Sequence, residues 1–278
     1  MLWLERMEKA MDYIEDHLEE EISLEALGKI TCCSPFHFQR IFSFLTEIPL
    51  ALYIRRRRMT KAAADLQAGG KVLDVALKYG YDSPTSFARA FASVHGITPS
   101  AAKKGAPLRA YPHIRFQIQI KGDTEMNYRI QEKEAFRIIG KKASLPSEME
   151  ACMQQIPLFW EALSAQESDA LCQANDALPQ GVLGICTPPK GGRIDYYIAA
   201  ASSQPAPEGM EEYTIPACTW AIFPCSGPLP DAIQEMQKRI TTQWLPSSGY
   251  DYADAPDIEL YFEDSYKSEI WMPVVKRS

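Results

Sequence analysis

The hydrophobic pattern changes its period near residue 108. Before it, apolar side chains recur at the i, i+3, i+4 and i+7 positions of amphipathic helices, as in Phe38, Ile41, Phe42 and Leu45. From residue 114 onward apolar and polar residues alternate, first in the segment 114–120, and helical patterns return only at about 147–165 and 229–245. The pattern predicts a helical domain over 1–108, a linker and leading strand over 109–125, and an α+β domain over 126–278.

A nine-residue pattern occurs twice in the helical part. SPxxFxRxF occupies residues 34–42 and recurs 49 residues later at 83–91. Each copy follows a short helical pattern, which begins at Leu24 before the first and at Val72 before the second. Two short helices joined by a tight turn, present twice, predict an all-α domain of tandem helix-turn-helix units.

The second helix of each unit carries polar residues opposite its apolar stripe. Ser34 and Ser83 are suited to the N-cap, and the proline after each fits the first helical position. Arginine can pair with guanine, glutamine with adenine, and an aromatic ring can contact the thymine methyl group. A plain helical hairpin with a polar outer face is the alternative, but two copies with arginine at the same place favour DNA reading. The residues expected to contact bases are Phe36, His37, Gln39, Arg40, Thr85, Ser86 and Arg89.

One longer helix is expected between the two units, from about Pro49 to Ala68, closed by two glycines. About 20 residues at 1.5 Å each span about 30 Å, close to the ~34 Å of one turn of B-DNA. A rod of this length would let both reading helices enter neighbouring major grooves. Its expected buried positions are Leu50, Ile54, Met59, Ala62, Ala63 and Leu66.

The charge is divided unevenly along a chain whose formal net charge is −7. Residues 1–28 carry two basic and nine acidic side chains, residues 29–109 thirteen and four, and residues 110–278 fourteen and twenty-three. The middle block can therefore meet a polyanion, although a solvated basic face would give the same count. Within the run of four arginines, some must pair with acids such as Glu47 or those of the first helix. The side chains expected at DNA phosphates are Arg55, Arg57, Arg58 and Lys61.

Residues 5–108 resemble the AraC/XylS family of bacterial transcription regulators. The resemblance is carried by SPFHFQRIF, YIRRRRMTKAAADL, VLDVALKYGYDSPTSFARAF and HGITPSAAKK. It implies base contacts from the positions of Phe36, Gln39 and Arg40 in the first unit and of Thr85, Ser86 and Arg89 in the second. The family's usual turn glycine is present as Gly80, but Cys32 stands at the first turn, where a left-handed backbone would cost about 1 kcal/mol or more. Gly28 also stands where alanine is typical.

The second half of the chain contains a duplication of its own. The segment from Tyr128 to Trp160 resembles the segment from Tyr213 to Trp244. Each combines strand patterns with a helical pattern, and further strand patterns follow. The duplication predicts an α+β domain of two βαββ modules that enclose a groove.

Residues 126–277 resemble the GyrI-like effector-binding domain through YRIQEKEAFRIIGKKA, DIELYFED and EIWMPVVK. The resemblance implies that Glu259 lies in an aromatic pocket for cationic or amphipathic organic ligands. Alternation places Glu259 on one strand face with Asp257 and Tyr261, and a carboxylate among aromatic rings favours organic cations. Core packing is the commoner role for any single tryptophan. The residues expected to bind the ligand are Glu259, Tyr261, Trp220, Trp271, Trp160 and Tyr197, with Trp244 and Tyr252 as further wall candidates.

Signals for catalysis, metals and membranes are missing from the sequence. No GxSxG, Walker or HExxH motif occurs, and none of the seven cysteines has CxxC spacing, so we expect no catalytic residue, no metal and no cofactor. An odd number of cysteines without CxxC pairs is typical of reduced thiols in a cytosol. The sequence shows neither a signal peptide nor an apolar run of membrane-spanning length.

These observations favour a cytoplasmic one-component transcription regulator. It would hold double-stranded promoter DNA through its first domain. A hydrophobic, cationic small molecule bound by the second domain would alter promoter occupancy or contact with RNA polymerase. The alternative is that the GyrI-like domain hydrolyses strained-ring compounds, with Glu259 as general base beside Tyr261, Tyr197 or Tyr252, or that it sequesters drugs.

Overall fold

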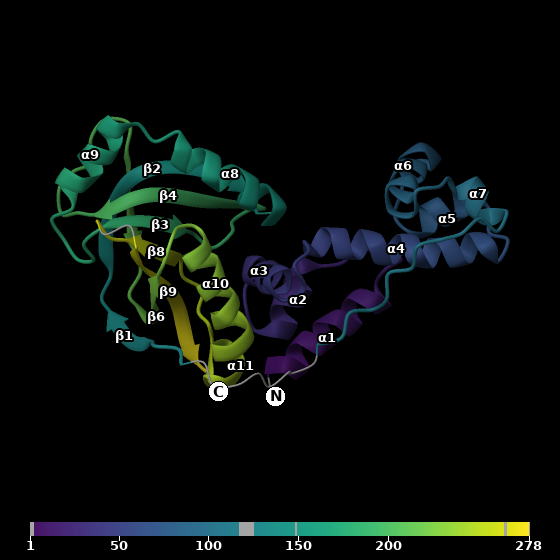
Figure 1. Ribbon diagram of the computed structural model, residues 1–278, viewed down its shortest axis with the longest axis horizontal. Coiled ribbons are helices and arrows are strands. Elements are labelled where there is room, and N and C mark those ends of the chain that lie inside the picture. Colours follow the sequence, from purple (N-terminus) through teal and green to yellow (C-terminus); the bar gives the residue numbers. More distant parts are fainter. Residues whose placement is uncertain (1–2, 117–124, 148, 264–265, 278) are drawn as a thin grey trace. The chain divides into compact units, whose positions relative to one another are not determined.

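The computed structural model describes residues 3–116, 125–147, 149–263 and 266–277 (Figure 1). The chain folds as two compact units, and the first comprises Met1–Thr31 with Thr46–Ile120. The second comprises Cys32–Leu45 with Lys121–Ser278. Helical segments therefore precede an α+β domain, as the change of period predicts. The first reading helix, however, belongs to the unit that contains the C-terminal sheet.

The first unit is helical. Its elements are α1 (Trp3–Asp16), α2 (Leu24–Thr31), α4 (Leu50–Gln67), α5 (Val72–Lys78), α6 (Pro84–His95) and α7 (Pro99–Lys103). The predicted long helix between the units is α4, and it ends within a residue of its predicted bounds. Five of the six positions expected to be buried on it are buried, and the sixth, Ile54, is half-buried.

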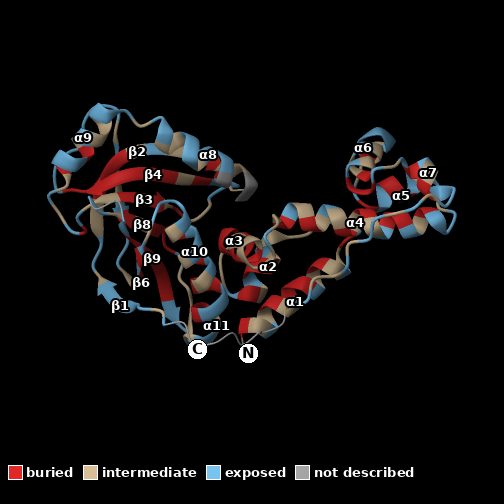
Figure 2. Ribbon diagram, viewed as in Figure 1, coloured by how far each residue is buried: buried red, intermediate tan, exposed pale blue. Residues whose placement is uncertain are grey.

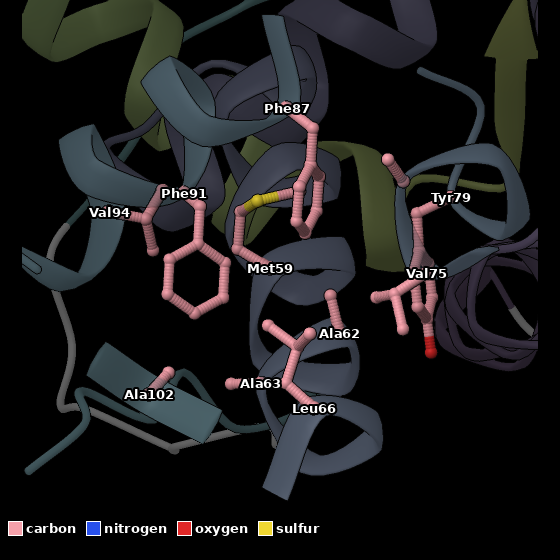
Figure 3. Close-up of a cluster of buried hydrophobic side chains, with 11 residues drawn as sticks. Met59, Ala62, Ala63, Leu66, Val75, Tyr79, Phe87, Phe91, Val94 and Ala102 are labelled. Atoms are coloured by element: carbon pink, nitrogen blue, oxygen red, sulfur yellow. The ribbon is translucent and has the colours of Figure 1, made fainter. Parts of the chain in front are cut away.

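The C-terminal half of α4 carries the core of the second helix-turn-helix unit (Figure 3). Met59, Ala62 and Leu66 pack with Phe87 and Phe91 of α6 in one buried cluster. Both phenylalanines are fully buried. The i, i+4 spacing of the repeated motif therefore fixes which face of α6 points inward.

A buried ion pair joins α1 to α4 within the same unit. Arg57 donates from Nε to Glu15 Oε1 at 2.8 Å and from Nη2 to Glu15 Oε2 at 2.6 Å, and the Tyr53 hydroxyl also donates to Glu15. Burial alone would raise the pKa of Glu15, but the hydrogen bonds from Arg57 and Tyr53 outweigh it and lower that pKa. Arg57 therefore pairs with an acidic residue of the first helix, as was expected for some arginines of the basic run.

The second unit joins α3 (Pro35–Thr46) to an antiparallel sheet with its covering helices. The strands are β1 (Arg129–Lys133), β2 (Phe136–Pro146), β3 (Val182–Cys186), β4 (Arg193–Ala201), β5 (Glu211–Ile215), β6 (Cys218–Ser226), β7 (Tyr250–Tyr252), β8 (Asp257–Tyr261) and β9 (Lys267–Lys276). The helices are α8 (Met149–Glu161), α9 (Ala165–Ala174), α10 (Asp231–Arg239), the π-helix Ile240–Trp244 and α11 (Leu245–Ser247).

The strand order reproduces the predicted duplication. It runs β1-β6-β9-β8-β3-β4-β2-β5, with β7 on β9. Strands β2, β3 and β4 of the first module lie together, as do β6, β8 and β9 of the second. Each module lends its leading strand to the other, because β1 pairs with β6 and β5 with β2. The modules meet where β8 pairs with β3, with Glu259 opposite Gly184.

Each face of this sheet has its own buried cluster (Figure 2 shows the strands largely buried). Leu183, Ile185, Ile258 and Leu260 belong to one cluster. Ile194, Tyr196 and Ile198 belong to another, with which Trp160 of α8 packs. Because side chains alternate along a strand, Glu259 lies on the face opposite Ile258 and Leu260. The helix-covered face therefore carries the predicted ligand carboxylate.

The structure departs from the predicted elements in two places. The leading strand expected at 114–120 is not formed over 114–116, and residues 117–120 lie outside the described residues. The helical pattern at 147–165 is confirmed by α8, but a further helix that was not predicted, α9, follows it and begins at a reciprocal capping box of Ser164 with Glu167.

Candidate functional site

The two reading helices start in the same way. The Ser34 hydroxyl accepts a hydrogen bond from the His37 amide at 3.2 Å, and the Ser83 hydroxyl accepts one from the Ser86 amide at 3.1 Å. Cys32 and Gly80, which occupy the two turns, both have left-handed backbones, with φ of 56° and 78°. The repeat therefore extends to the backbone, and the first turn places a cysteine where its side chain is disfavoured.

The second reading helix, α6, presents its predicted residues to solvent. Thr85, Ser86 and Arg89 are exposed, while Phe87 and Phe91 are buried. A helix N-terminus with an exposed arginine and hydroxyls has the chemistry needed for base edges and phosphates.

The first reading helix, α3, does not present its predicted residues to solvent. The expectation that Phe36, His37 and Gln39 are exposed is wrong, because their exposed fractions are 4%, 3% and 8%. Phe36 packs in the cluster that contains Leu145 and Ile194. The side chain of Arg40 is 14% exposed. The period of α3 identifies its apolar stripe correctly, but its other face packs against the sheet domain.

Asp257, the first residue of β8, holds that face of α3. Its Oδ2 accepts from Arg40 Nη1 at 2.9 Å and lies 2.8 Å from His37 Nε2. The His37 ring also stacks on Tyr252 of β7, with ring centres 4.2 Å apart. Burial alone would raise the pKa of Asp257, but His37 and Arg40 outweigh it and hold the pKa below its usual value. Asp257 is therefore an anion between two basic side chains of the reading helix.

The basic run on α4 is divided by its surroundings. Arg55 and Lys61 are exposed, whereas Arg56 lies over the Tyr111 ring at 4.8 Å. Arg58 donates to the backbone oxygen of Glu20 at 2.5 Å. The expectation that Arg57 reaches a phosphate conflicts with its burial and its ion pair with Glu15. Arg55 and Lys61 are the run's most accessible candidates for a phosphate backbone.

Glu259 lies at the centre of a polar and aromatic cluster on the helix-covered face of the sheet. The Tyr261 hydroxyl donates to Glu259 Oε2 at 2.7 Å, and Gln237 Nε2 of α10 donates to Oε1 at 2.7 Å. Burial, then the charge of Glu259, raises the pKa of Tyr261, so this hydroxyl stays protonated and continues to donate. Two neutral donors thus orient a carboxylate that has no basic partner among the described residues.

Aromatic rings edge this carboxylate. Trp160 of α8 packs edge-to-face on Tyr261, with ring centres 5.2 Å apart, and its Nε1 donates to the Tyr196 hydroxyl at 2.9 Å. A Cβ on Gly184 would lie 2.5 Å from the Tyr196 oxygen, 3.3 Å from the Trp160 ring and 3.5 Å from Glu259 Oε2. Only glycine at this position leaves room for the cluster, so Gly184 helps to define the site.

Three of the six residues expected to bind the ligand are not in this cluster. Glu259, Tyr261 and Trp160 come together as predicted. Trp220, Trp271 and Tyr197 belong to the cluster on the opposite face of the sheet, and all three are buried. Trp271 Nε1 donates to Glu269, and Tyr197 stacks on Tyr213. These three expectations are corrected by the alternation of the strands, which points their side chains away from Glu259.

Sequence reasoning missed Tyr196, Gln237 and Gly184. Tyr196 precedes Tyr197, and the alternation in β4 selects it for the Glu259 face. Among the further wall candidates, Tyr252 contacts His37, while Trp244 packs on Phe223 and Tyr128. A glycine opposite the predicted ligand carboxylate would have indicated space for a ligand. The pairing of Gly184 with Glu259 depends on the register of β3 and β8, which the sequence does not reveal.

In the described part of the chain, no group of three or more His, Cys, Asp or Glu side chains is arranged to hold a metal ion. Among the helices of the described residues, none combines the length and apolar character that a membrane span requires.

Comparison with known proteins gives matches to both halves. Residues 126–275 match the GyrI-like small molecule binding domain, and residues 27–105 match a helix-turn-helix domain family. A structure of SAV2435 bound to tetraphenylphosphonium is 26% identical, with a TM-score of 0.49, and the match covers 54% of this chain and 94% of that one.

Three curated relatives each match about a third of this chain. The transcriptional activator AarP of Providencia stuartii is 42% identical over 89 residues, which are 32% of this chain and 66% of AarP. The multiple antibiotic resistance protein MarA of Salmonella typhimurium is 36% identical over 90 residues, 32% of this chain and 71% of MarA. The right origin-binding protein of Escherichia coli is 33% identical over 100 residues, 36% of this chain and 35% of that protein.

Because these matches cover 66% of AarP and 35% of the right origin-binding protein, the activities of those whole proteins extend to this chain only as proposals. The family assignment rests on the helix-turn-helix match in one half and the effector-domain match in the other. The chain belongs to the AraC-type helix-turn-helix regulators and carries a GyrI-like small-molecule-binding domain.

Proposed function

We propose that this chain is a one-component transcription regulator that binds promoter DNA through α3 and α6 and a hydrophobic organic cation at Glu259. The observation that carries the proposal is the Glu259 cluster. A carboxylate is oriented by Tyr261 and Gln237, edged by Trp160, and part of the same chain as a tandem helix-turn-helix domain. A ligand site in the same chain as a DNA-binding domain is expected to regulate the binding of that domain to DNA.

The DNA-binding part of the proposal rests on α6 and α4. Arg89, Thr85 and Ser86 are exposed at the N-terminal half of α6, where base edges are read in helix-turn-helix proteins. Exposed Arg55 and Lys61 add positive charge on α4. Charges of this kind supply affinity that is independent of sequence, whereas the residues on α6 supply preference for particular bases.

The ligand chemistry follows from what surrounds Glu259. Its oxygens accept from two neutral donors, so the negative charge is oriented and not neutralised. Rings beside a carboxylate attract delocalised cations through charge and cation–π contact, with energies of up to about 2 kcal/mol where water is excluded. A hydrophobic monocation with aromatic or alkyl arms therefore fits better than a compact, strongly hydrated ammonium.

The hydrolase alternative shares this geometry. A glutamate paired with a tyrosine hydroxyl could activate water as a general base, and Tyr261 is the hydroxyl in contact with Glu259. Tyr197 lies on the opposite face of the sheet and Tyr252 contacts His37, so neither serves that role. Incubation with strained-ring compounds, followed by mass spectrometry of the recovered ligand, distinguishes cleavage from binding. Under the proposal the ligand returns unchanged.

The ligand site is tested by titration with tetraphenylphosphonium and with the neutral triphenylphosphine oxide. Glu259→Gln should weaken binding of the cation about tenfold or more and leave binding of the neutral compound nearly unchanged. The matched control is Glu212→Gln, because Glu212 pairs with Arg137 away from the cluster. Equal losses for both compounds would remove the role of charge.

Gly184→Ala provides a second test of the same site. The added methyl group must displace the Tyr196 hydroxyl, 2.5 Å away, or the Trp160 ring. We expect it to weaken binding of the cation and of the neutral compound alike, because it changes the shape of the site and leaves its charge. Unchanged binding of both would place the ligand elsewhere.

The DNA site is tested by selection of bound duplexes from a random pool, followed by affinity measurements at two salt concentrations. The proposal predicts an enriched sequence and a preference for it that persists at physiological salt. Binding that falls with salt and shows no sequence preference would reduce this domain to a nonspecific polycation.

A further inference from the structure

The face of α3 that should read the first major groove is occupied by the effector domain. Arg40 and His37 contact the Asp257 carboxylate, His37 stacks on Tyr252, and Phe36 packs among Leu145 and Ile194. The corresponding positions on α6 are exposed. The two copies of one motif thus differ in what covers them, and the cover of α3 belongs to the GyrI-like domain.

This contact and DNA reading by α3 exclude each other. Bidentate pairing of an arginine with guanine engages the guanidinium edge, and a major groove must surround the helix N-terminus. In the structure Arg40 Nη1 is committed to Asp257, and Phe36 and His37 are buried. Binding of α3 to bases therefore requires that it leave β8.

The ligand carboxylate lies beside this contact. Asp257 and Glu259 are two residues apart on one face of β8, about 7 Å along the strand. Burial alone would lower the pKa of Arg40, but the charges of Asp257 and, more weakly, Glu259 outweigh it and raise that pKa. A cation bound at Glu259 cancels part of the field that retains Arg40 and repels the guanidinium in surroundings of low dielectric.

We infer that β8 is an intramolecular docking site for the first reading helix, held by Asp257, and that an organic cation at Glu259 releases α3 for DNA. The inference rests on the proposed function, because it requires both a cation site and a DNA site. The new element is the coupling of the cation site to the DNA site. Arg40 and the bound cation compete for the negative charge of Asp257 and Glu259 on one face of β8.

An ion pair suits a reversible contact of this kind. A buried pair contributes little net stability, because the desolvation of both charges offsets most of their attraction. Loss of one partner is nonetheless costly, so a modest change in the field at Asp257 shifts the balance between the held and free helix. A ligand that binds better to the free state moves the population toward it in proportion to that preference.

The test is the affinity of Asp257→Asn and wild-type protein for a selected duplex, with and without tetraphenylphosphonium. Asparagine keeps the shape of the side chain and removes the charge that holds Arg40. We expect the ligand-free variant to bind the duplex about 5-fold to 150-fold more tightly than wild type, the usual range for coupling between two sites. The cation should tighten wild-type binding by a similar factor and leave the variant nearly unchanged.

The matched control is Asp251→Asn. Asp251 lies on β7 and pairs with Arg277 at 3.1 Å, with both side chains about 15% exposed, so the change is chemically equivalent. This variant should bind DNA and respond to the cation as wild type does. Its response also shows whether loss of any carboxylate in this sheet disturbs the domain.

The outcomes separate the inference from the proposed function. Equal duplex affinity and equal cation response in wild type and Asp257→Asn would overturn the docking site while DNA and ligand binding stand. No duplex binding by any variant, or no cation binding by wild type, would instead overturn the proposed function. If Asp257→Asn fails to fold, hydroxyl-radical labelling of wild-type side chains decides. The cation must increase labelling of Phe36, His37 and Tyr252, which lie in the contact between α3 and the sheet domain, and unchanged labelling there contradicts the docking site.

Discussion

Two helices with the same sequence motif have different environments in this protein. Helix α6 buries one stripe and exposes Thr85 and Arg89, whereas α3 buries Phe36 and commits Arg40, its counterpart of Arg89, to Asp257. The motif determines the cap, the turn and the apolar stripe of both. The contacts of the opposite face depend on residues far along the chain, so two copies of one motif need not both be exposed to DNA.

The largest expected difference between the helices concerns Phe36 and Thr85, which occupy equivalent positions of the repeat. Phe36→Ala empties a buried position and should lower the free energy of unfolding by about 3–5 kcal/mol, while exposed Thr85→Ala should stay within about 0.5 kcal/mol. Urea unfolding followed by tryptophan fluorescence measures both. Trp160, Trp220, Trp244 and Trp271 all lie in the unit that contains α3. Equal small losses would mean that α3 is as exposed as α6.

The two arginines of the repeat give the next largest contrast. Arg40→Ala leaves the buried Asp257 carboxylate with His37 alone, which should cost about 3 kcal/mol of unfolding free energy, at the low end for a broken buried pair. Arg89→Ala should change stability by less than about 0.5 kcal/mol, because its side chain is exposed. If both variants unfold at the wild-type urea concentration, the Asp257 contact contributes nothing.

Arg89, whose loss should hardly change stability, should matter most for DNA binding. Arg89→Ala should cost about 1–3 kcal/mol with a selected duplex and relax preference at one base pair, whereas Arg55→Ala should weaken all duplexes alike and reduce the salt slope by about 1. Titrations of matched and mismatched duplexes at several salt concentrations measure both quantities. The assignment of α6 to a groove is wrong if Arg89→Ala leaves base preference intact.

The smallest expected effects come from the two turns. Gly80→Ala should cost about 1–2 kcal/mol from the left-handed backbone alone, because the added Cβ would meet only the end of Arg58, at 3.7 Å. Cys32→Gly should raise the free energy of unfolding by up to about 1 kcal/mol at the equivalent turn. Thermal unfolding of both variants measures these shifts. A stabilising Gly80→Ala would contradict the left-handed turn.

Local rules predicted much of this fold. Capping serines, prolines at the first helical position and the i, i+4 spacing of phenylalanines identify both reading helices, and α4 follows from its apolar period and closing glycines. Duplication of the second half predicted the two modules of the sheet. Each of these features depends on residues close together in the sequence, and each was confirmed.

Long-range contacts account for what the sequence did not reveal. Apolar Ile258 and Leu260 alternate with Asp257, Glu259 and Tyr261 along the sequence, so the side chains of the latter three were correctly predicted to share one face of the strand. Alternation could not choose between Tyr196 and Tyr197, since both sheet faces around β4 are buried. Arg40 and Asp257 are 217 residues apart, so no local pattern indicates that α3 is covered.

The length of DNA protected from hydroxyl radicals tests the central claim most directly. Wild-type protein saturated with tetraphenylphosphonium, like ligand-free Asp257→Asn, should protect two major-groove segments about 34 Å apart, one for each reading helix. Ligand-free wild type should protect only the segment read by α6. Identical two-segment footprints from ligand-free and cation-saturated wild type would contradict the claim that the effector domain holds the first reading helix.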